Sequence, residues 1–147
     1  MTRLLDLTIA LPPRWRRRSD PEHGVLVHAR AGGVPAGGAA PELVLRCAPV
    51  DDDLAAWRRA AHAELEQRLV GFDLEDEDAF ELVGRPVIYA RFGHRLGLAE
   101  LVSEQWSWLI GRTGITLTGT VARDEYADYC DVFEAVAATF EPGSRVA

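Results

Sequence analysis

Near its start the chain alternates between apolar and polar positions. From residue 5 to residue 11 the odd positions hold leucine or isoleucine, the even positions hold Asp, Thr and Ala, and Pro12 ends the pattern. A period of two is typical of a strand with one buried face. The segments 24–30 and 42–48 are rich in valine and leucine and are typical of two more strands. The first third of the chain therefore predicts three strands.

After residue 50 the period becomes that of a helix. Acidic residues at 51–53 suit an N-cap and first turn, and Gly71 suits a C-terminal stop. The apolar positions form one stripe, made of Leu54, Trp57, Ala61, Leu65 and Leu69. The opposite side carries Arg58, Arg59, His62 and Glu66. We expect a helix over 52–70 that packs its apolar stripe on a larger element and exposes its charged side.

Strand patterns return in the second half of the chain. They cover 87–94, 101–111 and 115–122, and the turn "GRTG" makes the last two a hairpin. The acidic run "DLEDED" at 73–78 predicts an exposed turn and edge strand, where charge discourages pairing with other sheets. A second amphipathic helix is predicted over 123–140.

These elements predict the fold class and the number of domains. A chain of 147 residues suits one domain with a real core, so we expect a single domain over 1–147. The hairpin connections favour an α+β fold: a twisted, mainly antiparallel sheet of six to seven strands with two main helices packed on it.

The hairpin has two chemically different faces. One face is apolar and contains Trp106, Trp108 and Ile110, and the other is lined with hydroxyl groups. We expect the apolar face to receive the helices. Two hypotheses for binding follow. If helix packing leaves part of the apolar face open, Trp106, Trp108 and Ile110 are anchors for a protein partner; otherwise they are core residues.

The second binding hypothesis concerns the polar face of the sheet. Basic side chains from other strands join it if the strand registers agree: His28, Arg30, Arg46 and Arg91. Arginines on such a face suit a carboxylate or a phosphate, which they bind with paired hydrogen bonds. The alternative is an ordinary solvated face, as antiparallel sheets often have.

Charge argues against nucleic acid and membranes as partners. The net charge is −7, and all sixteen basic residues other than histidine are arginine. An acidic protein repels polyanions at long range, so we interpret the arginines at 14–18 as a solvated turn. No segment approaches the length of a membrane span or has the pattern of an export signal. We expect a cytoplasmic protein that is a monomer or a homodimer.

Catalytic and metal-binding motifs were sought and none was found. The four histidines lack ligand spacing, the four serines lie outside hydrolase motifs, and the two cysteines match no metal-binding or disulfide pattern. The acidic run lacks the glycine and terminal glutamate of a calcium loop. The glycine pairs lack the lysine and helix start of a phosphate loop. We therefore expect no catalytic residues, no metal and no cofactor.

The order of several motifs resembles a known superfold. "LPPRW", "HGVLVHAR", "PELVLRCAPVDDDLAAW", "LVGFDLEDE", "LVGRPVIYARF", "EQWSWLIG", "GITLTGTV" and "VFEAVAATF" follow one another over residues 5–141. This order is similar to the PsbP-like superfold, nearest to its actinobacterial LpqN-type branch, and more distantly to DcrB-type proteins and to the Eag chaperones of type VI secretion. The resemblance implies an α/β/α sandwich that binds other molecules rather than transforming them.

The residues and the resemblance together favour one function over another. The leading hypothesis is a non-enzymatic protein-binding module, a chaperone or adaptor for a secreted or membrane-associated partner. LpqN-type proteins are exported lipoproteins, so the missing export signal favours an intracellular partner. The alternative is a binder of small anionic ligands, or an undetected enzyme, that uses the polar face of the sheet.

Overall fold

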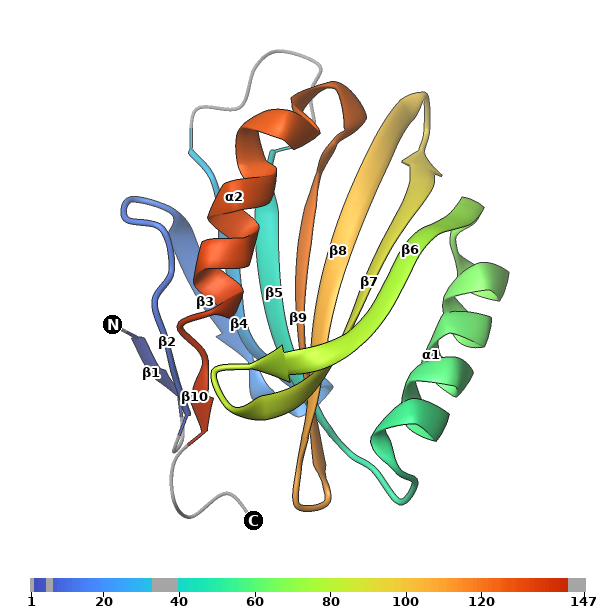
Figure 1. The fold of residues 1–147 in the computed structure, drawn as a ribbon. Coiled ribbons are helices and arrows are strands. Elements are labelled where there is room, and N and C mark those ends of the chain that lie inside the picture. Colours follow the sequence, from blue (N-terminus) through green and yellow to red (C-terminus); the bar gives the residue numbers. More distant parts are fainter. Residues whose placement is uncertain (1, 5–6, 33–39, 143–147) are drawn as a thin grey trace.

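In the computed structural model, a seven-stranded antiparallel sheet lies between two helices (Figure 1). The structure describes residues 2–4, 7–32 and 40–142. The strand order is β3-β4-β5-β9-β8-β7-β6. In that order the strands are Arg16–Asp20, Val25–Arg30, Glu42–Pro49, Thr113–Ala122, Ala99–Ile110, Arg85–Leu96 and Val70–Leu82. The helices are α1 at Leu54–Arg68 and α2 at Tyr126–Ala137, and short 3-10 turns occupy Pro21–His23 and Arg123–Glu125. The predicted α+β class, with six to seven strands and two main helices, is confirmed.

The N-terminal strand belongs to a small second sheet. β2 (Leu7–Ile9) pairs with β1 (Thr2–Leu4) and with β10 (Glu141–Pro142), so both ends of the described chain meet there. The prediction of one strand over 5–11 is therefore only partly met, since residues 5 and 6 lie outside the described part. Leu7 and Ile9 are buried, and they place this small sheet over the same face as α2 (Figure 1).

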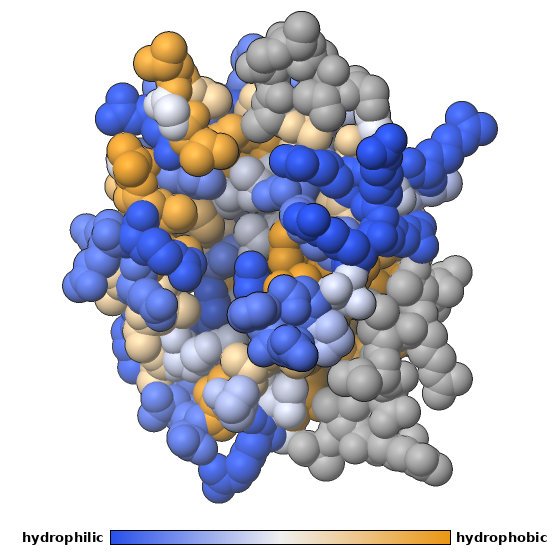
Figure 2. Space-filling view, turned by 180° about the vertical axis from the view of Figure 1, so that it is seen from behind, coloured by the Kyte–Doolittle hydropathy of each residue, from blue (hydrophilic) through white to orange (hydrophobic). Residues whose placement is uncertain are grey.

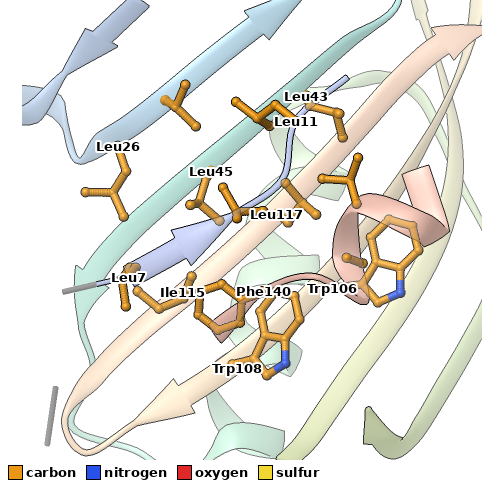
Figure 3. Close-up of a cluster of buried hydrophobic side chains, with 14 of the residues drawn as sticks. Leu7, Leu11, Leu26, Leu43, Leu45, Trp106, Trp108, Ile115, Leu117 and Phe140 are labelled. Atoms are coloured by element: carbon orange, nitrogen blue, oxygen red, sulfur yellow. The ribbon is translucent and has the colours of Figure 1, made fainter. Parts of the chain in front are cut away.

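The apolar face of the main sheet packs against α2 and the small sheet. Trp108 packs on Phe140 just after α2, with ring centroids 4.4 Å apart, among leucines and isoleucines from five strands (Figure 3). Phe133 of α2 lies directly on Gly119 of β9, where a Cβ atom would come within 2.7 Å of its ring. The helix can approach this closely only because position 119 has no side chain. This interface is the dry core predicted for the apolar face.

The prediction that both helices pack on the apolar face is wrong for α1. α1 packs across β6, β7 and β8 on the hydroxyl-lined face, and the side chains that it buries include Arg58 and His62. Both were expected on the solvent side of the helix. The polar face of the sheet is the reason: the groups beneath α1 are hydroxyls and an amide, which make hydrogen bonds to a guanidinium that leucine cannot make.

The two outer strands of the sheet carry opposite charge. β3 is a fully exposed edge strand with the sequence RRRSD. Arg16, Arg17 and Arg18 therefore lie on a strand, whereas Arg14 lies in a turn, as predicted. β6 contains the acidic run 73–78, and the predicted edge strand is confirmed there. Charge on both edges keeps the unpaired backbone groups from joining other sheets. In the described part of the chain, neither helix has the length and hydrophobicity needed to cross a bilayer.

Candidate functional site

An open space lies between α1 and the polar face of the sheet. We call it the helix–sheet cleft; it has a volume of about 500 Å³. Its floor is made of side chains from the central strands β8 and β9, namely Ser103, Gln105, Thr116, Thr118 and Thr120, and its wall is α1 from Trp57 to Arg68. Figure 2 looks onto this face, which is hollowed in the middle and mostly hydrophilic around the hollow. The alternation along β8 and β9 produces this floor, because every second side chain points away from the apolar core.

Hydrogen bonds along the floor hold its polar groups in fixed positions. Ser103 Oγ lies 2.7 Å from Thr120 Oγ1 and 2.9 Å from His94 Nε2. Gln105 Nε2 donates to Thr118 Oγ1 over 3.1 Å. Burial lowers the pKa of His94, with a smaller opposing effect from the charge of Glu42, so the imidazole is neutral at pH 7. The floor is therefore a rigid, uncharged hydrogen-bonding surface.

Arg58 carries a positive charge into the wall of the cleft. Its Nη2 donates to Gln105 Oε1 over 2.8 Å, and its Nη1 lies 3.5 Å from Thr116 Oγ1. The side chain is almost fully buried. Burial lowers its pKa to about 10, against a smaller raising effect from Glu77, so it remains charged at neutral pH.

Next to Arg58, His62 stays neutral. Burial and the charge of Arg58 lower its pKa, although its Nδ1 lies 3.0 Å from Glu77 Oε2. Its Nε2 has no hydrogen-bond partner in the described part of the chain. Sequence reasoning placed Arg58 and His62 outside, yet a signal existed: Arg58, His62, Leu65 and Leu69 follow the i, i+4, i+7, i+11 spacing of one helical face.

The structure brings three of the four predicted ligand residues to the polar face. Arg46 lines the cleft. His28 and Arg30 lie on the same face, because their strand partners Val44 and Glu42 in turn pair with Thr118 and Thr120. His28 Nε2 contacts Glu42 Oε2 at 2.8 Å, and Arg30 is exposed near the sheet edge.

Arg91 lies on the other face of the sheet, so its placement with the other three was wrong. It pairs across β8 with Glu104, and its Nε lies 3.3 Å from Glu75 Oε1. The register decides this outcome, because one position along a strand reverses the direction of the side chain.

The predicted partner anchors are core residues. Trp106, Trp108 and Ile110 are 3%, 2% and 6% exposed. α2, Phe140 and the small sheet cover this apolar face (Figure 3). The condition for a role as partner anchors, an open apolar face, is therefore not met, and the three side chains belong to the core.

One pair on the cleft floor has the spacing of a nucleophile and its base. Ser103 Oγ and His94 Nε2 are within hydrogen-bonding distance. Ser103 is, however, 2% exposed and shares its hydroxyl with Thr120, and the nearby carboxylate of Glu42 contacts His28. A serine nucleophile needs access to its substrate and a base oriented by a third group. The pair lacks the first, and the nearby carboxylate does not supply the second, so its geometry does not suit acyl transfer.

Comparison with known proteins finds likeness in structure only. No protein-family model and no curated protein sequence matches the chain. LpqN of Mycobacterium tuberculosis, a protein involved in cell envelope biogenesis, has a TM-score of 0.73 and 17% identity over 93% of this chain and 83% of its own. The Ran-binding protein Mog1p of Saccharomyces cerevisiae has a TM-score of 0.61 and 14% identity over 93% of this chain and 90% of its own. The cyanobacterial PsbP of Synechocystis has a TM-score of 0.54 and 14% identity over 87% and 92%.

These likenesses span almost the whole of each chain, and they share the arrangement of sheet and helices found here. At this level of identity they establish the fold and leave the chemistry of the cleft to be argued from its own residues. The chain therefore has the PsbP-like fold, of the kind seen in LpqN.

Proposed function

We propose that this chain is a non-enzymatic protein-binding module whose partner inserts a segment into the helix–sheet cleft. The observation that carries the proposal is the cleft itself: about 500 Å³ of open space over a fixed row of hydroxyl and amide groups. Such a row suits the backbone and polar side chains of a peptide segment. The likeness to Mog1p, a Ran-binding protein, supports a binding role for this fold.

An apolar rim beside the cleft supports a protein as the occupant. Leu96 follows His94 by two residues on the same face of β7, and Val70 directly follows the cleft residue Leu69. Val70 is 64%, Leu96 69% and Leu98 fully exposed. Figure 2 shows hydrophobic surface at the upper left of this face. A polar cleft with an exposed apolar rim is typical of a surface that a protein covers.

Photo-cross-linking tests the proposal directly. A photo-reactive phenylalanine in place of Glu64, on the wall of the cleft, is expected to capture a defined partner in cells. Leu98→Asp in the same protein is expected to abolish that capture, since it places a charge on the apolar rim. Val83→Asp is the control, because Val83 is also apolar and exposed but lies in the β6–β7 turn. Capture that survives Leu98→Asp would contradict the proposal.

A second candidate function is the binding of a small anionic ligand in the same cleft. Arg46 favours it, since this cleft side chain is exposed and makes no ion pair or hydrogen bond with any residue that the structure describes. A ligand that binds only the folded state raises the unfolding temperature. Citrate and inorganic phosphate are therefore expected to stabilise the wild type and not Arg46→Ala. Such stabilisation without any cross-linked protein would favour the small ligand over the partner segment.

A further inference from the structure

The α2 side of the sheet contains a second pocket, separate from the helix–sheet cleft. Its volume is about 330 Å³, and it lies between α2 and the second half of β6. In Figure 1, β6 bends forward over the sheet towards the lower end of α2. The even-numbered side chains of β6 from Asp76 to Leu82 point into this space, whereas Glu77 on the other face contacts His62 under α1. We call this space the acidic pocket.

Carboxyl groups and aromatic rings make up most of its wall. The carboxyl groups come from three elements and are Asp76, Asp78, Glu104 and Glu134. The rings are Phe80, Tyr89, Trp106 and Tyr126. Strand register brings the two kinds together, since Asp78 pairs with Tyr89, which pairs with Trp106. No basic side chain of the described residues lines the pocket, so its ionisable lining groups are carboxyl, phenol and thiol groups.

One carboxyl oxygen of Glu104 in this pocket lacks a hydrogen-bond donor. The residue is 5% exposed, and its Oε2 accepts a hydrogen bond from the hydroxyl of Tyr89. Its Oε1 has no hydrogen-bond partner among the residues that the structure describes. A buried carboxyl oxygen without a donor is costly, because it has lost its hydration and gained nothing in exchange. The side-chain carboxyl groups of Asp76 and Glu134 likewise make no hydrogen bond or ion pair with any described residue.

The nearest basic side chain, Arg91, lies at the edge of the pocket and is not part of its lining. Arg91 lies beside the pocket, 5.7 Å above the ring of Tyr126, and its Nε is 3.3 Å from Glu75. Arg123 also contacts Glu75. Arg91 thus shows how this surface holds a guanidinium, between a carboxylate and an aromatic face, while the pocket next to it has the same two kinds of group and no cation.

We propose that the acidic pocket binds the guanidinium or ammonium head of an organic cation. Carboxylates supply the charge and hydrogen-bond acceptors, and the aromatic walls attract a cation through their ring faces. An anion is repelled. A metal ion is disfavoured, because no three carboxyl, imidazole or thiol groups of the described residues are arranged to hold one. The head group has two sources, a free small amine or an Arg or Lys side chain of a partner.

Titration calorimetry with agmatine as the probe tests the proposal. Agmatine is expected to bind at one site, and the neutral butylurea, which keeps a planar head but lacks both the guanidinium and the ammonium charge of agmatine, is expected not to bind. Glu134→Gln, on the exposed surface of α2, should raise the dissociation constant about tenfold. Glu104→Gln is expected to do the same while keeping the volume of the side chain. Equal binding of butylurea, or no binding of agmatine, would overturn the proposal.

A matched control separates the pocket from the overall negative charge. Glu81 lies on the same strand β6 but is exposed and is not part of the pocket. Glu81→Gln removes one charge and is expected to leave the affinity for agmatine unchanged. If it weakens binding as much as Glu134→Gln does, the attraction is unspecific and the proposal fails.

A peptide arm of the experiment distinguishes the two sources. The capped tripeptide Gly-Arg-Gly, with its citrulline counterpart as the neutral control, is compared with agmatine. Tighter binding of the arginine peptide assigns the pocket to a partner's side chain, and tighter binding of agmatine assigns it to a free amine. The pocket lies on the face opposite the helix–sheet cleft, so this result is independent of Leu98→Asp and of cross-linking through position 64.

Discussion

Each helix approaches the sheet by placing an aromatic ring on a glycine of β9. Phe133 of α2 lies on Gly119, and Trp57 of α1 lies on Gly114, where a Cβ atom would come within 2.7 Å and 2.5 Å of the respective ring. Beyond this shared feature the two interfaces differ. Phe133 is completely buried in a dry core, whereas Trp57 is half-buried at the side of an open cleft. The same contact, an aromatic ring on a glycine, therefore occurs in a closed interface on the apolar face and beside an open cleft on the polar face.

The buried ionisable groups of the two faces respond to burial in opposite directions. Under α1, desolvation lowers the pKa of Arg58, His62 and His94. Under α2, desolvation raises the pKa of Glu104 and Tyr89. The cause is the same, because burial disfavours whichever form carries the charge. The cleft therefore contains bases that burial makes easier to deprotonate, and the pocket contains acids that burial makes harder to ionise.

Removing the aromatic ring of each helix should give the largest difference in unfolding free energy between the two faces of the sheet. Phe133→Ala is expected to cost about 3–5 kcal/mol of unfolding free energy, as core aromatic truncations do. Trp57→Ala is expected to cost roughly 1–2 kcal/mol, because its ring is only half-buried. Denaturant-induced unfolding measures both values. Equal losses of unfolding free energy would show that α1 is packed as tightly as α2. They would contradict the contrast between a closed and an open interface.

Removing the buried guanidinium should have a smaller effect. Arg58→Ala is expected to cost about 1–3 kcal/mol, since it leaves the amide oxygen of Gln105 without its donor. The neighbour Arg59 is exposed, so Arg59→Ala should change stability by less than about 0.5 kcal/mol. The same unfolding measurement compares the two. A negligible effect of Arg58→Ala would mean that the polar contact under α1 adds nothing to stability.

The pH dependence of stability should differ in sign between the faces. The pKa of Glu104 is higher in the folded protein than in the unfolded one. Its contribution to the unfolding free energy is therefore present below the unfolded-state pKa of about 4.3, and it is lost as pH rises through the folded-state pKa. His62 has a lowered folded pKa, so its contribution is present above about 6.5 and is lost as pH falls through the folded pKa. As pH rises, the unfolding free energy of Glu104→Gln should increase relative to that of the wild type. The unfolding free energy of His62→Gln should decrease relative to it.

Unfolding curves recorded at a series of pH values, for both variants and the wild type, measure these differences. Glu81→Gln serves as the reference for removing an exposed charge. A Glu104→Gln difference that does not change with pH would show that the carboxyl group ionises as easily in the folded protein as in the unfolded one.

Several features of the fold could be predicted because they depend on local pattern. The alternation of β8 and β9, the acidic edge strand β6 and the amphipathic stripe of α2 each determine their own element. The two-faced character of the hairpin was also readable, and with it the hydroxyl floor of the cleft. The direction in which Arg91 points could not be predicted from the sequence, because it depends on the register between β7 and β8.

The sequence by itself determined the β8–β9 hairpin, the acidic edge strand, the two helices and the opposite chemistry of the two sheet faces, because these follow from the spacing of side chains along the backbone. Only the tertiary structure decided which face each helix covers. α1 crosses to the polar face, which buries Arg58, leaves the cleft beside it and frees the apolar face for α2 and the small sheet. Trp106 and Trp108 became core residues for the same reason: burial depends on which element arrives over a side chain, and the pattern of one strand does not contain that information.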